Sequence, residues 1–156
     1  MSNVYTPATL AERMRRRERK PILKARERRG VYFIEMMTLP LIKVGFTMDI
    51  ERRRSTIQTH LPFRVSIAAF YSPAEPAHET MLHNILAADH YGNEWFHYSR
   101  RVERVMSDLD DWYADDKITT HHGLGLRLER YKAPEFDGAD DLIDTQITRD
   151  WLMRVF

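Results

Sequence analysis

Two short runs of β-prone residues, separated by a turn, constrain the fold of this chain more than any other feature. Residues 31–36 read Val-Tyr-Phe-Ile-Glu-Met, and residues 41–46 read Leu-Ile-Lys-Val-Gly-Phe. Both runs are rich in β-branched and aromatic residues, which favour extended backbone. The segment from Thr38 to Pro40 lies between them and favours a turn. The pattern therefore predicts a β-hairpin with one charged residue, Lys43, inside its second apolar run.

The residues after the hairpin have the periodicities of alternating helices and strands. Asp49 is positioned to cap a helix, and Val65, Ile67 and Ala69 alternate as one face of a strand would. The further predicted elements are a helix over 50–60, a strand over 63–71, helices over 76–90 and 99–115, a strand over 123–131 and a helix over 139–155. The pattern predicts an α/β (α+β) fold with a small three-stranded, mainly antiparallel sheet flanked by helices.

Charge divides the chain into a basic, a neutral and an acidic part. Residues 1–30 carry ten Lys/Arg and three Glu, a net charge of +7, whereas residues 103–156 carry seven Lys/Arg and thirteen Asp/Glu, a net charge of −6. We therefore expect a basic helical arm over 1–29, a core domain over 30–116 and an acidic C-terminal extension over 117–156. The strand and helix predicted in the extension would enlarge the domain or dock a protein partner.

The basic arm favours a polyanionic partner, either nucleic acid or anionic lipid. A membrane-binding helix would also need large apolar side chains, and the arm contains neither Trp nor Phe. Nucleic acid is therefore the expected partner. The arm side chains expected to contact its phosphates are Arg15, Arg16, Arg17, Arg19 and Lys20.

Composition removes several other classes of protein. The chain has no cysteine, which excludes disulfide scaffolds, thiolate zinc sites and cysteine nucleophiles. No stretch approaches the roughly 20 apolar residues that span a bilayer, so no membrane partner is expected. No apolar segment of the signal-peptide type follows the N-terminal charges. We therefore expect a cytoplasmic location.

A set of polar residues occurs in order along the predicted hairpin and the helices after it. A Gly-Val-Tyr segment ends at Tyr32 on the first strand, and a Lys-Val-Gly segment begins at Lys43 on the second. Arg53 lies on the following helix, and Glu79 lies on the next one. A Gly-Asn-Glu-Trp-Phe segment follows at residues 92–96.

These residue types can supply what cleavage of a phosphodiester needs: an activated nucleophile, charge relief on the phosphate and help for the leaving oxygen. A carboxylate such as Glu79 can hold a divalent cation, and the Arg53 guanidinium can bind phosphate through two parallel hydrogen bonds. Tyr32 can take or relay a proton from the attacking water. Lys43 is expected across the hairpin from Tyr32, where its charge would lower the pKa of the phenol.

Over residues 30–98 the ordered set resembles the GIY-YIG nuclease superfamily, in particular its phage-type branch. The resemblance implies a fold of this type and assigns the same roles to these residues. Tyr32 would be the base, Arg53 would bind phosphate, and Glu79 would hold one Mg²⁺ or Mn²⁺.

Two further residues extend the resemblance, and three positions depart from it. His83 lies one helical turn after the expected metal ligand and would orient metal-bound water or phosphate. Asn93 corresponds to an asparagine that occurs late in many members. The superfamily name implies Ile and Tyr where this chain has Val31 and Lys43, and many members have a His where this chain has Ile57.

The sequence thus predicts a metal-dependent endonuclease acting on DNA, with Arg52 and Arg54 adding contacts to the nucleic acid. RNA stays open as a substrate. Two other classes also stay open: a catalytically inactive DNA-binding module on the same fold, and a phage or host regulatory module that binds a protein through residues 117–156. Activity that depends on Glu79 separates the enzyme from the inactive module. A homodimer also stays open, because a nuclease with one active site must either dimerise or cut twice to break a duplex.

Overall fold

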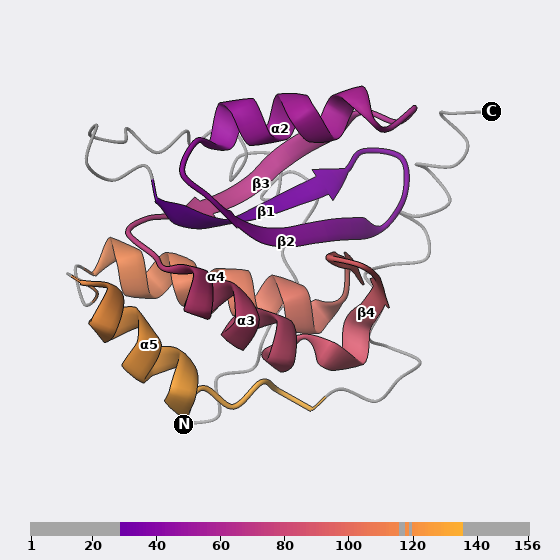
Figure 1. Cartoon of the computed structure of the whole chain (residues 1–156). Helices are drawn as coiled ribbons and strands as arrows, with labels where there is room; N and C mark the ends of the chain where they lie inside the picture. The colour runs from indigo at the N-terminus through magenta and orange to yellow at the C-terminus, as the bar shows by residue number, and fades with distance from the viewer. Residues whose placement is uncertain (1–28, 116–117, 119, 136–156) are drawn as a thin grey trace.

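The structure is a computed structural model that describes residues 29–115, 118 and 120–135. Figure 1 shows its elements, which in chain order are β1 (Gly30–Met36), β2 (Leu41–Thr47), α2 (Ile50–Thr59), β3 (Val65–Tyr71), α3 (Pro76–Ile85), the 3₁₀ helix η1 (Ala87–Asp89), β4 (His90–Gly92), β5 (Trp95–His97), α4 (Arg100–Ala114) and α5 (His121–Arg130). The predicted hairpin, the third strand and the helices predicted between residues 50 and 115 are confirmed, with ends that differ by a few residues.

A five-stranded antiparallel sheet organises these elements in the order β3-β1-β2-β5-β4. The predicted sheet of three strands is therefore too small. β5 pairs with β2, so that Trp95 lies opposite Lys43, and β4 pairs with β5 at the edge of the sheet. Each of the two additional strands has three residues. Such a strand is too short to display the alternation from which strands are predicted.

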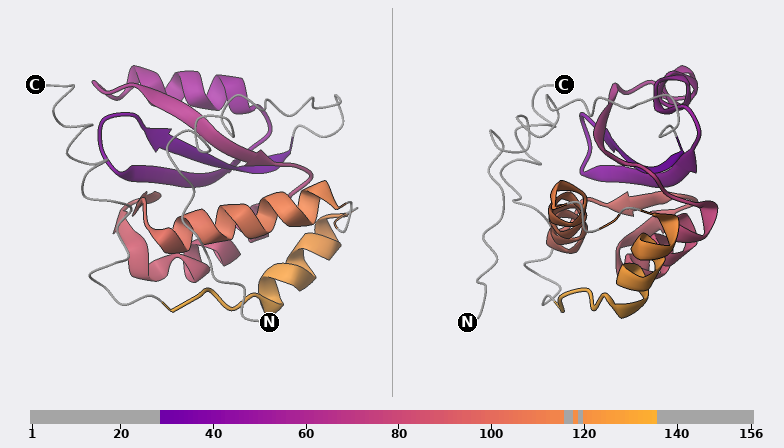
Figure 2. Two further views of the ribbon diagram at one scale, coloured as in Figure 1. Left: turned by 180° about the vertical axis from the view of Figure 1, so that it is seen from behind. Right: turned by 90° about the vertical axis from the view of Figure 1, so that its left-hand side faces the viewer.

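Helices cover both faces of the sheet, and the alternation of side chains along β1 explains why. Tyr32 and Ile34 point to the face covered by α2, where they pack with Ile57. Val31 and Phe33 point to the other face, where they join a core built with α3, α4 and α5. Figure 1 and Figure 2 show these helices on opposite sides of the sheet. The side chains of these four β1 residues are fully buried. A central strand covered by helices on both faces requires such burial.

α5 replaces the strand predicted over residues 123–131, so that prediction is wrong. Leu124 and Leu128 are buried in the core one helical turn apart, whereas Leu126 is 38% exposed. The Thr120 hydroxyl oxygen caps the helix by accepting a hydrogen bond from a first-turn N–H at 3.2 Å. Leucines two residues apart fit a strand, but only the pair four residues apart faces the core.

Two other predictions lie outside the described residues: the basic arm up to residue 28, with Arg15, Arg16, Arg17, Arg19 and Lys20, and the helix over 139–155. The predicted division into arm, core domain and extension stays a prediction. Within the described part, α5 packs onto the same core as α3 and α4. No helix in this part of the chain is long and apolar enough to cross a membrane.

Candidate active site

Tyr32 and Gly45 form the base of the candidate site. Tyr32 of β1 lies directly opposite Gly45 of β2. The Tyr32 ring lies so close to the glycine that a Cβ atom at position 45 would fall on its hydroxyl and ring carbons, so only glycine leaves the space. Tyr32 is fully buried, and Arg53 Nε donates a hydrogen bond to its hydroxyl at 3.1 Å. The hairpin register thus delivers the phenol to the face beneath α2.

α2 brings one of its three consecutive arginines to the site. Asp49 caps the helix by accepting a hydrogen bond from the backbone N–H of Arg52 at 3.0 Å. Arg53 lies one turn before Ile57, which is buried against the sheet, so both side chains occupy the inner face of the helix. Arg52 is exposed, and Arg54 pairs with a glutamate of the same helix at 3.5 Å. The helical period therefore selects the middle arginine.

α3 places two of the predicted residues against the edge of β2. β5 pairs with β2 only as far as Lys43, and side chains of α3 continue the hydrogen bonding beyond that point. His83 Nε2 lies 2.8 Å from the carbonyl oxygen of Val44, and because a carbonyl can only accept, Nε2 donates. The Glu79 carboxylate accepts a hydrogen bond from the backbone N–H of Phe46. Both α3 side chains are thereby held beside the hairpin.

Glu94, in the turn between β4 and β5, connects the two halves of the site. Its carboxylate accepts a hydrogen bond from Lys43 Nζ at 2.5 Å and lies 3.7 Å from Arg53 Nη2. Its backbone carbonyl accepts a hydrogen bond from the Val44 N–H at 3.1 Å. Glu94 is not among the predicted site residues. The signal that could have identified it is Lys43, since a lysine inside an apolar strand needs an acidic partner.

The two carboxylates have pKa values shifted in opposite directions. Burial raises the pKa of Glu79, and the charge of Glu94 raises it further, while His83, a backbone N–H and Arg53 oppose the shift in part. Burial also acts to raise the pKa of Glu94, but the hydrogen bond and charge of Lys43, together with Arg53 and His83, outweigh it and lower the pKa. Glu94 is therefore the stable anion of the pair.

Tyr32 is a neutral phenol at neutral pH. Burial raises the pKa of Tyr32, the two carboxylates add to the shift, and the hydrogen bond and charge of Arg53 oppose it. Lys43 lies opposite Ile34 instead of Tyr32, and its ammonium group binds Glu94. The predictions that Lys43 faces Tyr32 and lowers its pKa are therefore wrong, because the hairpin register sets Lys43 two residues away from the facing position.

Glu79 and Glu94 are the oxygen donors that could hold a cation here. The described residues contain no group of three or more His, Cys, Asp or Glu side chains that could hold a metal ion. A cation at this site would therefore take one or two carboxylates and complete its coordination with water and phosphate oxygens, as Mg²⁺ commonly does. Lys43 already binds the Glu94 carboxylate, so Glu79 would be the first ligand of such an ion and Glu94 its neighbour.

Asn93 shapes the turn that carries Glu94. It has a positive φ of 53°, a conformation that asparagine adopts more readily than most residues, and its carbonyl accepts a hydrogen bond from His90 Nε2 at 2.8 Å. The predicted site residues that the structure brings together are Tyr32, Lys43, Arg53, Glu79 and His83.

Comparison with known proteins places this cluster in a family. Residues 29–114 match the family model of the T5orf172 domain, and the match covers more than half of the chain. Searches of curated proteins and of solved structures gave no match. Every residue of the cluster, from Tyr32 to Glu94, lies within the matched range. The chain belongs to the T5orf172 family, a family of nuclease-associated domains.

Proposed function

We propose that this protein is a metal-dependent endonuclease of the GIY-YIG type that hydrolyses phosphodiester bonds in DNA. The observation that carries the proposal is the convergence of the Tyr32 hydroxyl, the Arg53 guanidinium and the carboxylates of Glu79 and Glu94 at one place. These groups come from β1, α2, α3 and the β4–β5 turn. Shifted pKa values beside a specific charge partner are typical of functional sites, and the nuclease-associated family supports the same reading.

In this proposal Arg53 binds the scissile phosphate. Its Nε is engaged by Tyr32, and its Nη2 lies 3.7 Å from Glu94, beyond hydrogen-bond distance, so the Nη groups keep N–H donors for phosphate oxygens. Its side chain is 37% exposed, which leaves it accessible to a substrate. Arg52 and Arg54, on the outer part of the same helix, add positive charge toward the DNA backbone.

Tyr32 acts on the proton of the attacking water. Because burial raises the pKa of Tyr32, a free phenolate is disfavoured. Tyr32 is therefore better suited to relay a proton than to act as a base. The phenol receives one proton from the water as it passes its own proton to the leaving oxygen. Arg53 stabilises the negative charge that develops on the phenol oxygen during this exchange. The proton count balances, since the water loses one proton and the leaving oxygen gains one.

The remaining residues hold the arrangement. Glu79, with Glu94 beside it, would hold one Mg²⁺ or Mn²⁺, which when bound supplies charge relief to the phosphate and the leaving oxygen. Lys43 keeps Glu94 ionised and fixed in place. His83 joins α3 to β2 through the Val44 carbonyl and so positions Glu79, which lies one helical turn away.

Cleavage of supercoiled plasmid at low salt with Mg²⁺ or Mn²⁺ tests the proposal. Wild type should convert the plasmid to nicked or linear DNA, and Glu79→Ala and Tyr32→Phe should each lower the rate by about 100-fold or more. Glu129→Ala, which removes an exposed carboxylate from α5, is the matched control and should cut like wild type. If wild type shifts DNA on a gel but cuts no substrate, the enzyme proposal fails and the DNA-binding module replaces it.

A further inference from the structure

Part of the sheet beside the site has no role in the chemistry above. On the face that carries Tyr32, α2 packs over β1 and β3. On the same face, β2, β5 and β4 extend the sheet toward its other edge. The register places Trp95 and His97 on this face, since they lie opposite Lys43 and Leu41 of β2. The extension therefore presents an aromatic and an imidazole ring next to the lysine of the site.

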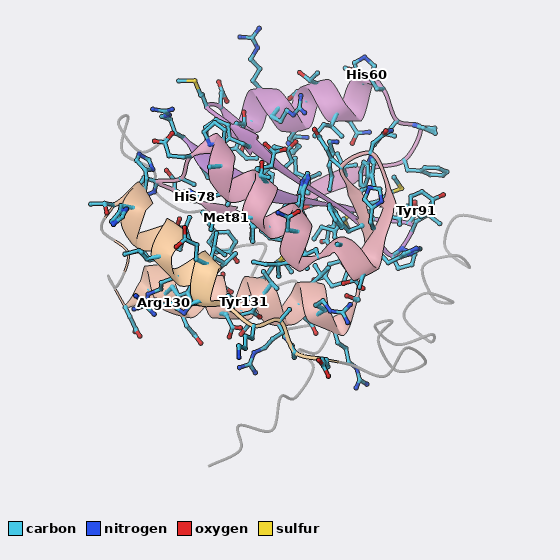
Figure 3. The ribbon with its side chains drawn as sticks, turned by 60° about the horizontal axis from the view of Figure 1, so that its bottom comes forward. His60, His78, Met81, Tyr91, Arg130 and Tyr131 are labelled. Atoms are coloured by element: carbon cyan, nitrogen blue, oxygen red, sulfur yellow. The ribbon has the colours of Figure 1, made fainter. Side chains whose placement is uncertain are left out.

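Tyr91 completes this row of rings at the edge of the sheet. The residues before and after it pair with β5, but Tyr91 itself is the extra residue of a bulge, a device that redirects a side chain. Its ring packs edge-on against His97, with ring centres 5.3 Å apart and planes at 88°. Tyr91 is nevertheless 63% exposed, and Figure 3 shows it at the margin of the fold, on the other side of the picture from His78.

The turn that carries Tyr91 is fixed relative to the site. His90 Nε2 donates to the carbonyl of Asn93, which closes the turn, and Glu94 is bound to β2 through its backbone and its side chain. Tyr91 and Glu94 are thus three residues apart on one braced turn. Trp95, next in sequence, lies under Lys43, whose Nζ is 5.7 Å from the ring centre. The exposed ring is therefore carried by the same hydrogen-bonded turn as the Glu94 carboxylate of the site.

We infer that Tyr91, with the neighbouring Trp95 and His97, is a stacking platform for an unpaired base of the DNA next to the bond that is cut. The inference rests on the proposed function, which supplies DNA as the ligand. Every base has a π-face, so an exposed aromatic ring binds unpaired bases with little regard to sequence, while nearby cations hold the backbone. Arg53 and the exposed Arg52 are such cations. The platform makes DNA with an unpaired end or gap a better ligand than a continuous duplex.

Binding measured in EDTA, where no metal-dependent cleavage occurs, tests the platform directly. The dissociation constants of three fluorescent DNAs are compared: a duplex, the duplex with a short single-stranded tail, and the duplex with the same tail made abasic. The abasic tail keeps the phosphates and lacks the bases. Wild type should bind the tail with bases about 10-fold more tightly than the abasic tail, because stacking contributes about that factor per base.

Variants at one position assign the effect. Tyr91→Ala should remove most of the preference for bases, Tyr91→Phe should keep it, and Leu126→Ala, an exposed position on α5, should leave it unchanged. Equal affinity of wild type for the two tails, or a preference that survives in Tyr91→Ala, overturns the inference. Self-association that Tyr91→Ala abolishes, without any preference for bases, would assign the face to a second copy. If plasmid cleavage fails while the preference for bases persists, only the proposed function is refuted.

Discussion

The Glu79 carboxylate is less stable as an anion in the folded protein than in the unfolded chain. Its oxygens are desolvated, and the negative charge of Glu94 lies nearby. Glu94 is the opposite case, because Lys43 and Arg53 favour its charged form. Two carboxylates whose environments drive their pKa values apart are suited to different tasks. At the scale of single residues, this difference leads to a test that needs no knowledge of the substrate.

Glu79→Gln should raise the melting temperature at neutral pH. Glutamine keeps an acceptor for the backbone N–H of Phe46 and removes the desolvated charge. Because the pKa of Glu79 is raised in the folded state, ionisation begins to destabilise the fold above the unfolded value of 4.5, and the destabilisation is complete above the folded pKa. The gain should therefore be full near pH 8 and should fade as the pH drops toward the ordinary value of 4.5. Thermal unfolding followed by circular dichroism across this range measures it.

Glu94→Gln is the matched control with the opposite sign. The pKa of Glu94 is lowered in the folded state, so its anion stabilises the fold above the unfolded value of 4.5 and loses that contribution as the pH falls through the folded pKa. This variant should melt below wild type at neutral pH and approach it in acid. Two variants that shift the melting temperature in the same direction at neutral pH would contradict the electrostatic account.

At the scale of elements, the β1–β2 hairpin depends on the close contact between Tyr32 and Gly45. Gly45→Ala should destabilise the protein by about 1–3 kcal/mol, because the new methyl group forces the Tyr32 ring and the β2 backbone apart. Gly123→Ala is the control: the nearest atom to a Cβ there is 3.7 Å away, and alanine in α5 should stabilise by about 0.5–1 kcal/mol. Urea denaturation measures both. Equal stabilities of wild type and Gly45→Ala would refute the packing argument.

The elements that could be predicted from the sequence are those with a long periodic pattern. The hairpin, α2, β3, α3 and α4 each show several repeats of their period, and all are present. β4 and β5 have three residues each and owe their existence to pairing with β2, which no local pattern encodes. The strand predicted over residues 123–131 failed because leucine spacing alone is ambiguous, and packing onto the core selected the helix.

The same limit applies inside the site. Tyr32, Arg53 and Glu79 could be predicted because each occupies a fixed place in an ordered motif. Which residue faces Lys43 depends on the hairpin register. The register pairs Lys43 with Ile34, two residues along β1 from Tyr32, so the predicted contact between Lys43 and Tyr32 is wrong. Glu94 becomes a site residue only through the pairing of β5 with β2, a contact between segments 51 residues apart.

At the scale of the whole molecule, charge is distributed unevenly along the chain. Residues 1–30 carry a net charge of +7, and residues 103–156 carry −6. Binding to DNA releases counterions in proportion to the phosphates that the protein contacts, so the logarithm of the binding constant should fall linearly with the logarithm of the salt concentration. The unequal distribution predicts which end of the chain sets that slope.

Removal of residues 1–28 should make the salt dependence of DNA binding shallower. Each lost phosphate contact reduces the slope by about 0.9, so a loss of several contacts should reduce it by about 2 or more. Removal of residues 136–156, which carry two arginines and five aspartates, is the control and should leave the slope unchanged or make it steeper. Anisotropy titrations from about 50 to 200 mM salt measure the slopes. Identical slopes for the N-terminal deletion and wild type would remove the arm from the DNA contact.

The way α3 lies along β2 has a consequence for solubility. The carbonyl of Val44 and the N–H of Phe46 point out of the sheet edge and are occupied by His83 and Glu79. Backbone groups of this kind, when open, are a template on which a strand of another molecule can add, and such additions lead to aggregates. By occupying these two backbone groups, His83 and Glu79 also prevent a strand of another molecule from pairing with β2. A substitution that removes either side chain would reopen this edge to a strand of another molecule, whatever its effect on activity.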